Sequence, residues 1–249
     1  MHTARMTRLS ALTALTALAL VGCDPTEKDD VTIDDGYVYA CLGHDGDETE
    51  PSYGYSTFTI SGEVVSDGAF VAPDNDVHRC FSEDRALTIC DDDGTIWTLG
   101  YSVTDSDGED ITPPLDVAPG QDIELFFASL QDFGVISGFV LRDEGGVVAA
   151  LEGGSWGSAL DPDGDADPID EFEVSVGEAV LTEETGCGEV EHRELVFTGD
   201  SEVALVPGES GAFTVDGAEL TASALRSFDY TGETTCTDVA GATVWTVWR

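Results

Sequence analysis

The sequence predicts an all-β protein, folded as an antiparallel β-sandwich or a barrel-like sheet of about twelve strands. Short runs rich in β-branched and aromatic residues alternate apolar with polar side chains, which is the period of a half-buried strand. Gly, Asp and Pro separate these runs at spacings of about eight to fifteen residues. After the N-terminus the best helix candidate is 218–225, and the Thr, Ser, Phe and Tyr residues around it favour a strand there too.

The expected strands follow one another along the whole chain. In order they are 37–42, 57–65, 86–90, 95–103, 123–128, 135–142, 147–151, 172–176, 194–197, 202–206, 212–215, 220–230 and 243–248. The glycine-ending turns at 91–94 and 143–146 predict two hairpins. Alternation in most strands indicates antiparallel sheets with one face in water. Because Trp245 and Trp248 are three positions apart, they should point to opposite faces, one in the core and one near the surface.

The chain is strongly acidic, with 51 Asp and Glu against nine Lys and Arg and a formal net charge of −42. Residues 1–22 hold two of the arginines and no acid, so without them seven basic residues face 51 acidic ones, a charge of −44. Such a surface repels nucleic acid and anionic lipid headgroups, which excludes nucleic acid as a partner. Since 41% of the residues are hydrophobic, we expect a folded chain with an acidic, solubilising coat rather than a disordered one.

The N-terminus has the organisation of a bacterial export signal. Arg5 and Arg8 give it a positive charge, and residues 9–21 form an apolar run of 13 residues. That run is too short to cross a bilayer core, which requires about 20 residues. Its length and its basic flank are those of a secretory signal peptide.

The apolar run closes on Leu20-Val21-Gly22-Cys23, which resembles the lipobox of bacterial lipoproteins. The resemblance implies a diacylglyceryl group on the Cys23 thiol, cleavage before Cys23, and a new N-terminus that carries an acyl chain such as palmitate. More than one chain makes anchoring stable, since each buried methylene contributes about 0.8 kcal/mol. The implied partner is therefore a membrane of the bacterial cell envelope. Whether this membrane is the inner or the outer one, and whether the ectodomain is periplasmic or surface-exposed, stays open.

The chain divides into a signal peptide (1–22), a lipidated Cys23 with an acidic tether (23–35), and a β ectodomain (36–249). The tether could reach roughly 40 Å if extended. Residues 111–120 contain three of the nine prolines and resemble a linker, so the alternative is an ectodomain split there. We favour a single ectodomain, because the piece before the split, about 75 residues, would be marginal by itself.

Export to an oxidising compartment favours disulfides over metal thiolates, and the chain has no Cys-x-x-Cys pair. Five cysteines follow the lipobox, so at least one is free or pairs between chains. We predict a Cys187–Cys236 disulfide, which closes a loop of about 50 residues and contributes roughly 3–4 kcal/mol. Among the others we favour Cys80–Cys90, which leaves Cys41 over. Pairing of Cys41 with Cys80 or with Cys90 stays open.

The best candidate for a metal site is an acidic loop. Its aspartates occupy every second position: Asp161, Asp163, Asp165 and Asp167. Ca²⁺ requires six to eight hard oxygen ligands, and the spacing resembles the Asp-rich calcium loops of EF-hand-like and thrombospondin type 3 modules. The pattern departs from an EF-hand, because Ala166 replaces the glycine at position six and Phe172 the glutamate at position twelve. Calcium here is an alternative to a solvated loop. Loops 91–94 and 105–110 are weaker instances.

Catalytic motifs give no coherent site. Residues 153–157 match the G-x-S-x-G string of a nucleophile elbow, but that motif requires a strand-to-helix turn in an α/β sheet. The histidines of the ectodomain, His44, His78 and His192, are too scattered for a zinc site. We therefore predict no catalytic residues. A hydrolase whose site has no readable motif is the lesser alternative.

Aromatic side chains could instead stack on sugar rings. The candidates are Tyr53, Tyr55, Trp97 and Trp156, of which Trp97 is expected in the core and Trp156 in a loop. The sequence thus predicts a membrane-anchored envelope lipoprotein with a non-enzymatic ectodomain that binds a partner or serves structurally. An envelope protein or a glycan is the candidate partner, and calcium-dependent or glycan binding is the alternative function.

Overall fold

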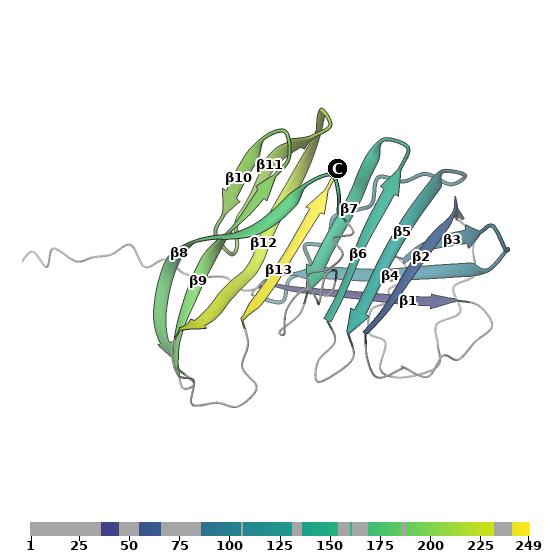
Figure 1. The fold of residues 1–249 in the computed structure, drawn as a ribbon. Coiled ribbons are helices and arrows are strands. Elements are labelled where there is room, and N and C mark those ends of the chain that lie inside the picture. The colour runs from purple at the N-terminus through teal and green to yellow at the C-terminus, as the bar shows by residue number, and fades with distance from the viewer. Residues whose placement is uncertain are drawn as a thin grey trace, which may run out of the picture. The chain divides into compact units, whose positions relative to one another are not determined.

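The architecture is all-β, which confirms the fold class that the alternating sequence pattern predicts (Figure 1). The computed structural model describes residues 36–44, 55–65, 86–105, 107–130, 136–153, 160, 169–185, 188–231 and 241–249. All of them belong to one compact unit, Thr32–Arg249. Thirteen strands form one antiparallel sheet, and no helix occurs within the described ranges.

The strand bounds lie close to the predicted ones except at the eighth and ninth strands. They are β1 (Tyr37–His44), β2 (Tyr55–Val64), β3 (Ala86–Asp91), β4 (Ile96–Thr104), β5 (Asp122–Leu130), β6 (Ile136–Asp143), β7 (Gly146–Gly153), β8 (Glu173–Thr185), β9 (Gly188–Thr198), β10 (Glu202–Leu205), β11 (Ser210–Val215), β12 (Ala218–Thr231) and β13 (Ala242–Trp248). The helix candidate at 218–225 is part of β12, as predicted.

The last strand of the chain joins the two halves of the sheet. The strand order is β1-β4-β3-β2-β5-β6-β7-β13-β12-β9-β10, with β11 also paired to β12 and β8 to β9. Strands β5, β6 and β7 are successive neighbours, and β13 lies between β7 and β12 (Figure 1). The sheet is not closed, because the described pairings run from β1 to β10 without returning.

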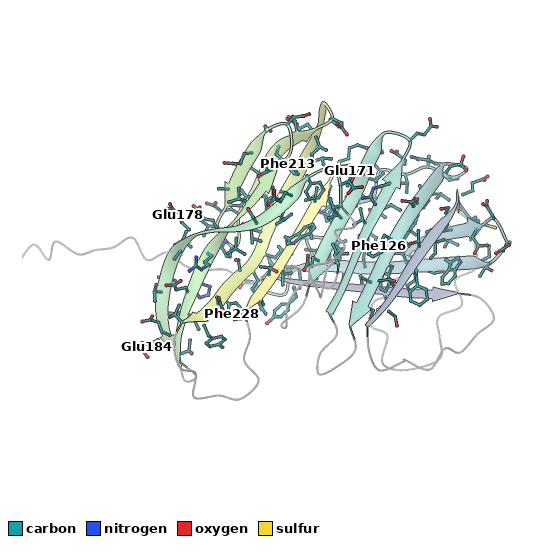
Figure 2. The ribbon with its side chains drawn as sticks, in the orientation of Figure 1. Phe126, Glu171, Glu178, Glu184, Phe213 and Phe228 are labelled. Atoms are coloured by element: carbon teal, nitrogen blue, oxygen red, sulfur yellow. The ribbon has the colours of Figure 1, made fainter. Side chains whose placement is uncertain are left out.

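The central strands bury side chains on both faces. On β6, Phe139 and Leu141 belong to one buried cluster and Val140 between them belongs to another. The first core is shared with β1, β3 and β4, and β1 contacts β6 and β7 across it. The second core is shared with β9 to β12 and contains Phe213 of β11 (Figure 2). The central strands are therefore a common layer between two cores.

The two tryptophans of β13 show the effect of this arrangement. Trp245 lies in the second core and Trp248 in the first, so they point to opposite faces as predicted. Both are buried, however, at 3% and 6% exposure, and the prediction that one lies near the surface is wrong. The reason is that a sheet covered on both sides leaves β13 no wet face.

The two predicted hairpin turns are confirmed. Gly94 ends the β3–β4 turn with φ +84° and Gly146 ends the β6–β7 turn with φ +100°, both in the region that favours glycine. Segment 111–120, which resembles a linker in sequence, packs on the first core through Leu115 and Val117. It also bonds to β4, where the Thr112 hydroxyl accepts from the Val103 amide at 2.7 Å.

Strands β8 and β9 are much longer than predicted. They form a hairpin that is paired from Glu173–Thr198 to Thr185–Gly188. The sequence did not reveal their length, because glutamates interrupt the alternation of apolar and polar residues in both strands. Glu178 and Glu184 are exposed along β8 (Figure 2). The register shifts between Val176 and Ala179 and again before Leu181. Charged side chains and bulges are devices by which an exposed edge strand resists pairing with other chains.

Two ion pairs link β6 to other parts of the chain, one to the C-terminal residue and one to the segment before β8. The Arg249 guanidinium donates to both carboxylate oxygens of Asp143, with Nη1 to Oδ1 at 2.9 Å, and this hydrogen bond lowers the pKa of Asp143 below its ordinary value. Arg142 binds Glu171 in the same way, with Nε to Oε1 at 2.6 Å. Burial raises the pKa of Glu171, but the hydrogen bonds and charge of Arg142 outweigh it and the pKa is lowered.

Removing the C-terminal guanidinium should destabilise the fold. We expect Arg249→Met, which keeps the aliphatic stem, to cost about 2 kcal/mol, because Asp143 is left without its charged donor. Thermal unfolding followed by circular dichroism should show a drop in Tm of roughly 4–8 °C. Glu144→Gln, an exposed change in the same turn, is the control and should leave Tm unchanged. Equal Tm values for Arg249→Met and the wild type would contradict a stabilising role for the pair.

Acid should abolish the contribution of the same pair. Because the folded-state pKa of Asp143 is lowered, its stabilisation is complete above the ordinary Asp pKa of about 4 and is lost as the pH falls through the lowered value. The difference in unfolding free energy between wild type and Asp143→Asn should be constant from about pH 7 to about pH 5 and then shrink on acidification. Urea titrations over this range measure it, and a difference that does not change with pH would refute the assignment.

Candidate functional site

Two adjoining cavities lie between β8, β9, β12 and β13. The first has a volume of about 240 Å³ and the second of about 450 Å³, and Val176 and Thr243 line both. We call the pair the β8 groove. Val176, at 52% exposure, is an exposed large hydrophobic side chain at this position. The second cavity is within the size range of small-molecule sites in proteins, and the first is slightly below it.

The first cavity has both apolar and polar residues in its wall. Its wall contains Leu160, Ile169, Phe172, Val174, Leu195 and Trp245. The Phe172 and Trp245 rings meet edge to face, with centroids 6.2 Å apart and an interplanar angle of 77°. Glu152, at the end of β7, is the acid in this wall and is 6% exposed. The cavity thus combines a rigid aromatic surface with a single buried carboxyl group.

The pairing register explains how polar side chains reach the groove. Glu152 on β7 is opposite Trp245 on β13, and Thr243, two residues before Trp245, is opposite Ser227 on β12. Residues two apart on a strand share a face. Glu152, Trp245, Thr243, Ser227 and then Asp229 therefore follow one face of the sheet, and all five line the two cavities.

Ser227 is the least expected of these residues. It is 1% exposed, and its hydroxyl has no hydrogen-bond partner within the described part of the chain. Leaving a buried polar group unsatisfied costs about 1–3 kcal/mol. Because Ser227 lines the second cavity, a polar group of a bound molecule could relieve this cost.

Arg193 brings a positive charge to the second cavity, but that charge is compensated. Its guanidinium pairs with Glu191 and donates to the Gly177 carbonyl at 3.3 Å. Within the described residues the other arginines are also engaged: Arg142 and Arg249 with carboxylates, and Arg226 over the Tyr37 ring at 4.3 Å from its centroid. The charged side chains that line the two cavities are thus two acids, Glu152 and Asp229, and one arginine that is already paired.

His192 lies on the other side of the sheet. It is opposite Phe228, whose side chain is on the face away from Ser227. Its Nε2 is 3.2 Å from Oε1 of Glu183, and its Nδ1 is buried without a partner among the described residues. Ser227 and His192 are thus neighbours in the register on opposite faces, and they do not form a nucleophile–base pair.

The acidic loops that the structure describes use their carboxylates for their own turns. Asp91 accepts from the Trp97 indole at 2.8 Å and from the Thr95 and Asp93 amides, and the Trp97 hydrogen bond is the main cause of its lowered pKa. Asp105 accepts from two backbone amides of its own loop. No cluster of metal-ligating side chains is found in the described ranges. The stronger calcium candidates, Asp161, Asp163, Asp165 and Asp167, lie outside these ranges.

Other predicted site residues are only partly visible. Cys23, His78, Tyr53, Ser155 and Trp156 lie outside the described residues, and the side chains of His44 and Tyr55 are not described. Gly153 of the G-x-S-x-G string has a packing role, because a Cβ there would lie 3.1 Å from Cβ of Val38 on β1. Trp97, which the sequence predicts in the core, is only partly buried and packs against the first core, with its ring centroid 6.1 Å from that of Phe58.

The structure corrects the cysteine pairing. Cys41 is disulfide-bonded, to a partner outside the described residues, whereas Cys90 is a free thiol. The favoured Cys80–Cys90 disulfide is therefore wrong. It requires Cys90 to be bonded and Cys41 to be unpaired, and the structure has the reverse. Sequence proximity is a poor guide here, because a disulfide requires a short Cα separation and aligned Cβ vectors. Cys187 and Cys236 lie outside the described residues, and their pairing stays a prediction.

Thiol labelling should distinguish the two cysteines. In urea without reductant, iodoacetamide should modify Cys90 and leave Cys41 unmodified, because only a thiolate reacts. After reduction both should be modified. Peptide mapping by mass spectrometry reads the result, and an unmodified Cys90 before reduction would contradict the assignment.

Comparisons with known proteins add no family or fold relative: no family model, curated protein or solved structure matches the chain. A search of the described residues for a helix of sufficient length and apolarity to cross a membrane finds none.

Sequence reasoning missed the groove. Glu152 carries a weak signal, because it is a single acid at the end of the otherwise apolar run 147–151. Ser227 and Thr243 carry no signal at all, since a serine or threonine in a strand usually faces water. Ser227 and Thr243 line the groove only because the pairing of β8, β9, β12 and β13 places them on the same face of the sheet.

Proposed function

We propose that the chain is a membrane-anchored envelope lipoprotein whose acidic β ectodomain acts in binding rather than in catalysis. The observation that supports the anchor is the sequence Leu20-Val21-Gly22-Cys23 at the end of a 13-residue apolar run with Arg5 and Arg8 before it. A lipid on Cys23 would hold the ectodomain at the membrane through the 23–35 tether, which could reach roughly 40 Å.

The β8 groove supports a binding role for the ectodomain. It joins two cavities whose walls combine apolar side chains with a few polar ones, and ligand sites of this kind fix a molecule by shape and orient it with polar groups. Its buried hydroxyl, Ser227, is separated by the sheet from the imidazole of His192. The described geometry thus favours recognition of a small molecule over hydrolysis. Calcium or glycan binding by the loops at 154–168 stays a separate hypothesis.

Lipidation at Cys23 is testable with one substitution. After expression in a bacterium that processes lipoproteins, the intact mass of the wild-type chain should exceed that of residues 23–249 by the mass of its acyl groups. The chain should also enter the detergent phase in a detergent phase-partition experiment. Cys23→Ser should abolish both properties. Cys90→Ser, which removes the free thiol, is the control and should change neither. An unmodified mature chain, or one that begins at another residue, would overturn the anchor.

A further inference from the structure

We propose that the second cavity of the β8 groove binds a small primary amine through its ammonium group. This inference rests on the proposed binding function and names the class of ligand. It follows from three observations: a buried hydroxyl without a partner, two facing carboxylates that share one guanidinium, and an exposed apolar side chain in the same wall.

The hydroxyl of Ser227 indicates a polar ligand in this cavity. Ser227 lines the cavity, is 1% exposed, and its Oγ has no hydrogen-bond partner within the described part of the chain. Thr243 on β13 is opposite it and lines the same cavity, and residues directly opposite each other share a face of the sheet. A ligand that donates a hydrogen bond to Ser227 would remove the cost of this unpaired oxygen.

Beside this hydroxyl, one arginine serves two carboxylates. Asp229 on β12 is directly opposite Glu191 on β9, and like charges in that position destabilise a sheet. The Arg193 guanidinium pairs with Glu191 and donates to the Gly177 carbonyl on β8. Asp229 has no cationic partner among the described residues, and its Oδ1 accepts from the backbone amide of Tyr230 at 2.8 Å. A cation beside Asp229 would therefore relieve the repulsion between the two acids.

The acceptors in this part of the wall match the donors of a primary ammonium group. Such a group has three N–H donors and no acceptor. Ser227 and Thr243 offer two hydroxyl oxygens, and Asp229, two residues beyond Ser227 on the same face, offers its second carboxylate oxygen. Three acceptors can thus receive the three hydrogens. A quaternary ammonium group has the same charge but no hydrogen to donate, so recognition should depend on the N–H donors as well as on charge.

An anion or an uncharged alcohol suits the cavity less well. The whole chain has a formal charge of −42, which attracts cations and repels anions. An anion would also have to displace Glu191 from Arg193, the positively charged side chain in this wall. An alcohol could bind Ser227, but it would leave Asp229 without a counter-charge.

The apolar part of the wall fits a short alkyl tail. Val176 lines the cavity and is 52% exposed. A tail that covers this side chain removes apolar surface from water on both partners, which favours binding. The cavity volume of about 450 Å³ is within the range of small-molecule sites, so the amine should be a small one.

Four molecules with the same butyl tail test the class of ligand. Butylamine has the charge and the N–H donors, butyltrimethylammonium has the charge alone, butanol is neutral and butanoate is an anion. The lipidated full chain in neutral detergent is titrated with each at about 0.15 M salt, which screens the exposed acids. NMR follows the methyl resonances of Val176 and Thr243. Butylamine should shift both with a single Kd, and the other three should bind at least roughly tenfold more weakly.

Substitutions locate the site. Asp229→Asn and Ser227→Ala should each weaken butylamine binding by roughly tenfold. Both variants should fold, because Asp229 is exposed and because alanine at 227 removes an unpaired buried oxygen without adding volume. Glu178→Gln removes one carboxylate from an exposed position on β8 outside the groove (Figure 2). It is the matched control and should leave butylamine binding unchanged.

The outcomes separate the ligand class from the binding function. If butyltrimethylammonium, butanol or butanoate shifts the two methyl resonances as tightly as butylamine does, the ammonium assignment is overturned but the groove remains a binding site. Butylamine binding that Asp229→Asn and Glu178→Gln weaken equally would show ion binding over the acidic surface and overturn the proposal. No shift of either methyl resonance with any of the four molecules would overturn the groove as the basis of the proposed function.

Discussion

The structure depends on a central layer of strands that is buried on both faces. Strands β5, β6, β7 and β13 contribute alternate side chains to two separate cores, as Phe139 and Val140 show on β6. Because water is excluded from both sides of such a layer, most residues of its strands are apolar. All of β7 after Gly146 is buried. Each core in turn requires the outer strands, β1, β3 and β4 for the first and β9 to β12 for the second.

The β8 groove lies where that two-sided burial ends. β8 and β9 lose register between Val176 and Ala179, next to the place where Val176 lines both cavities. A bulge adds a residue to one strand and bends it away from its partner. Glu152 and Ser227 line the cavities beside it, although both side chains are buried. The candidate site is thus a consequence of how the sheet ends, rather than an addition to it.

Charged and apolar side chains lie in different parts of the fold. Many of the described acids lie on turns and on the β8–β9 hairpin, where water solvates them, whereas the described arginines are partly buried and each contacts an acidic or aromatic side chain. Arg142 and Arg249 each hold a carboxylate by two hydrogen bonds, and Arg249 fixes the chain end to the β6–β7 turn. With so few cations, the surface stays strongly negative. This explains why the exposed face of an otherwise ordinary β protein should select cations and repel anionic surfaces.

Local sequence was sufficient for the fold class, for the approximate position of most strands along the chain and for the Gly94 and Gly146 turns, because alternation and turn chemistry act over a few residues. It failed where burial depends on distant segments. The sequence does not reveal that Trp245 and Trp248 are both buried, because the layers that cover them come from opposite ends of the chain. It also could not determine which cysteine is free, nor that Glu152 and Ser227 line two adjoining cavities. Those facts require strands far apart in sequence to become neighbours, and only tertiary structure decides that.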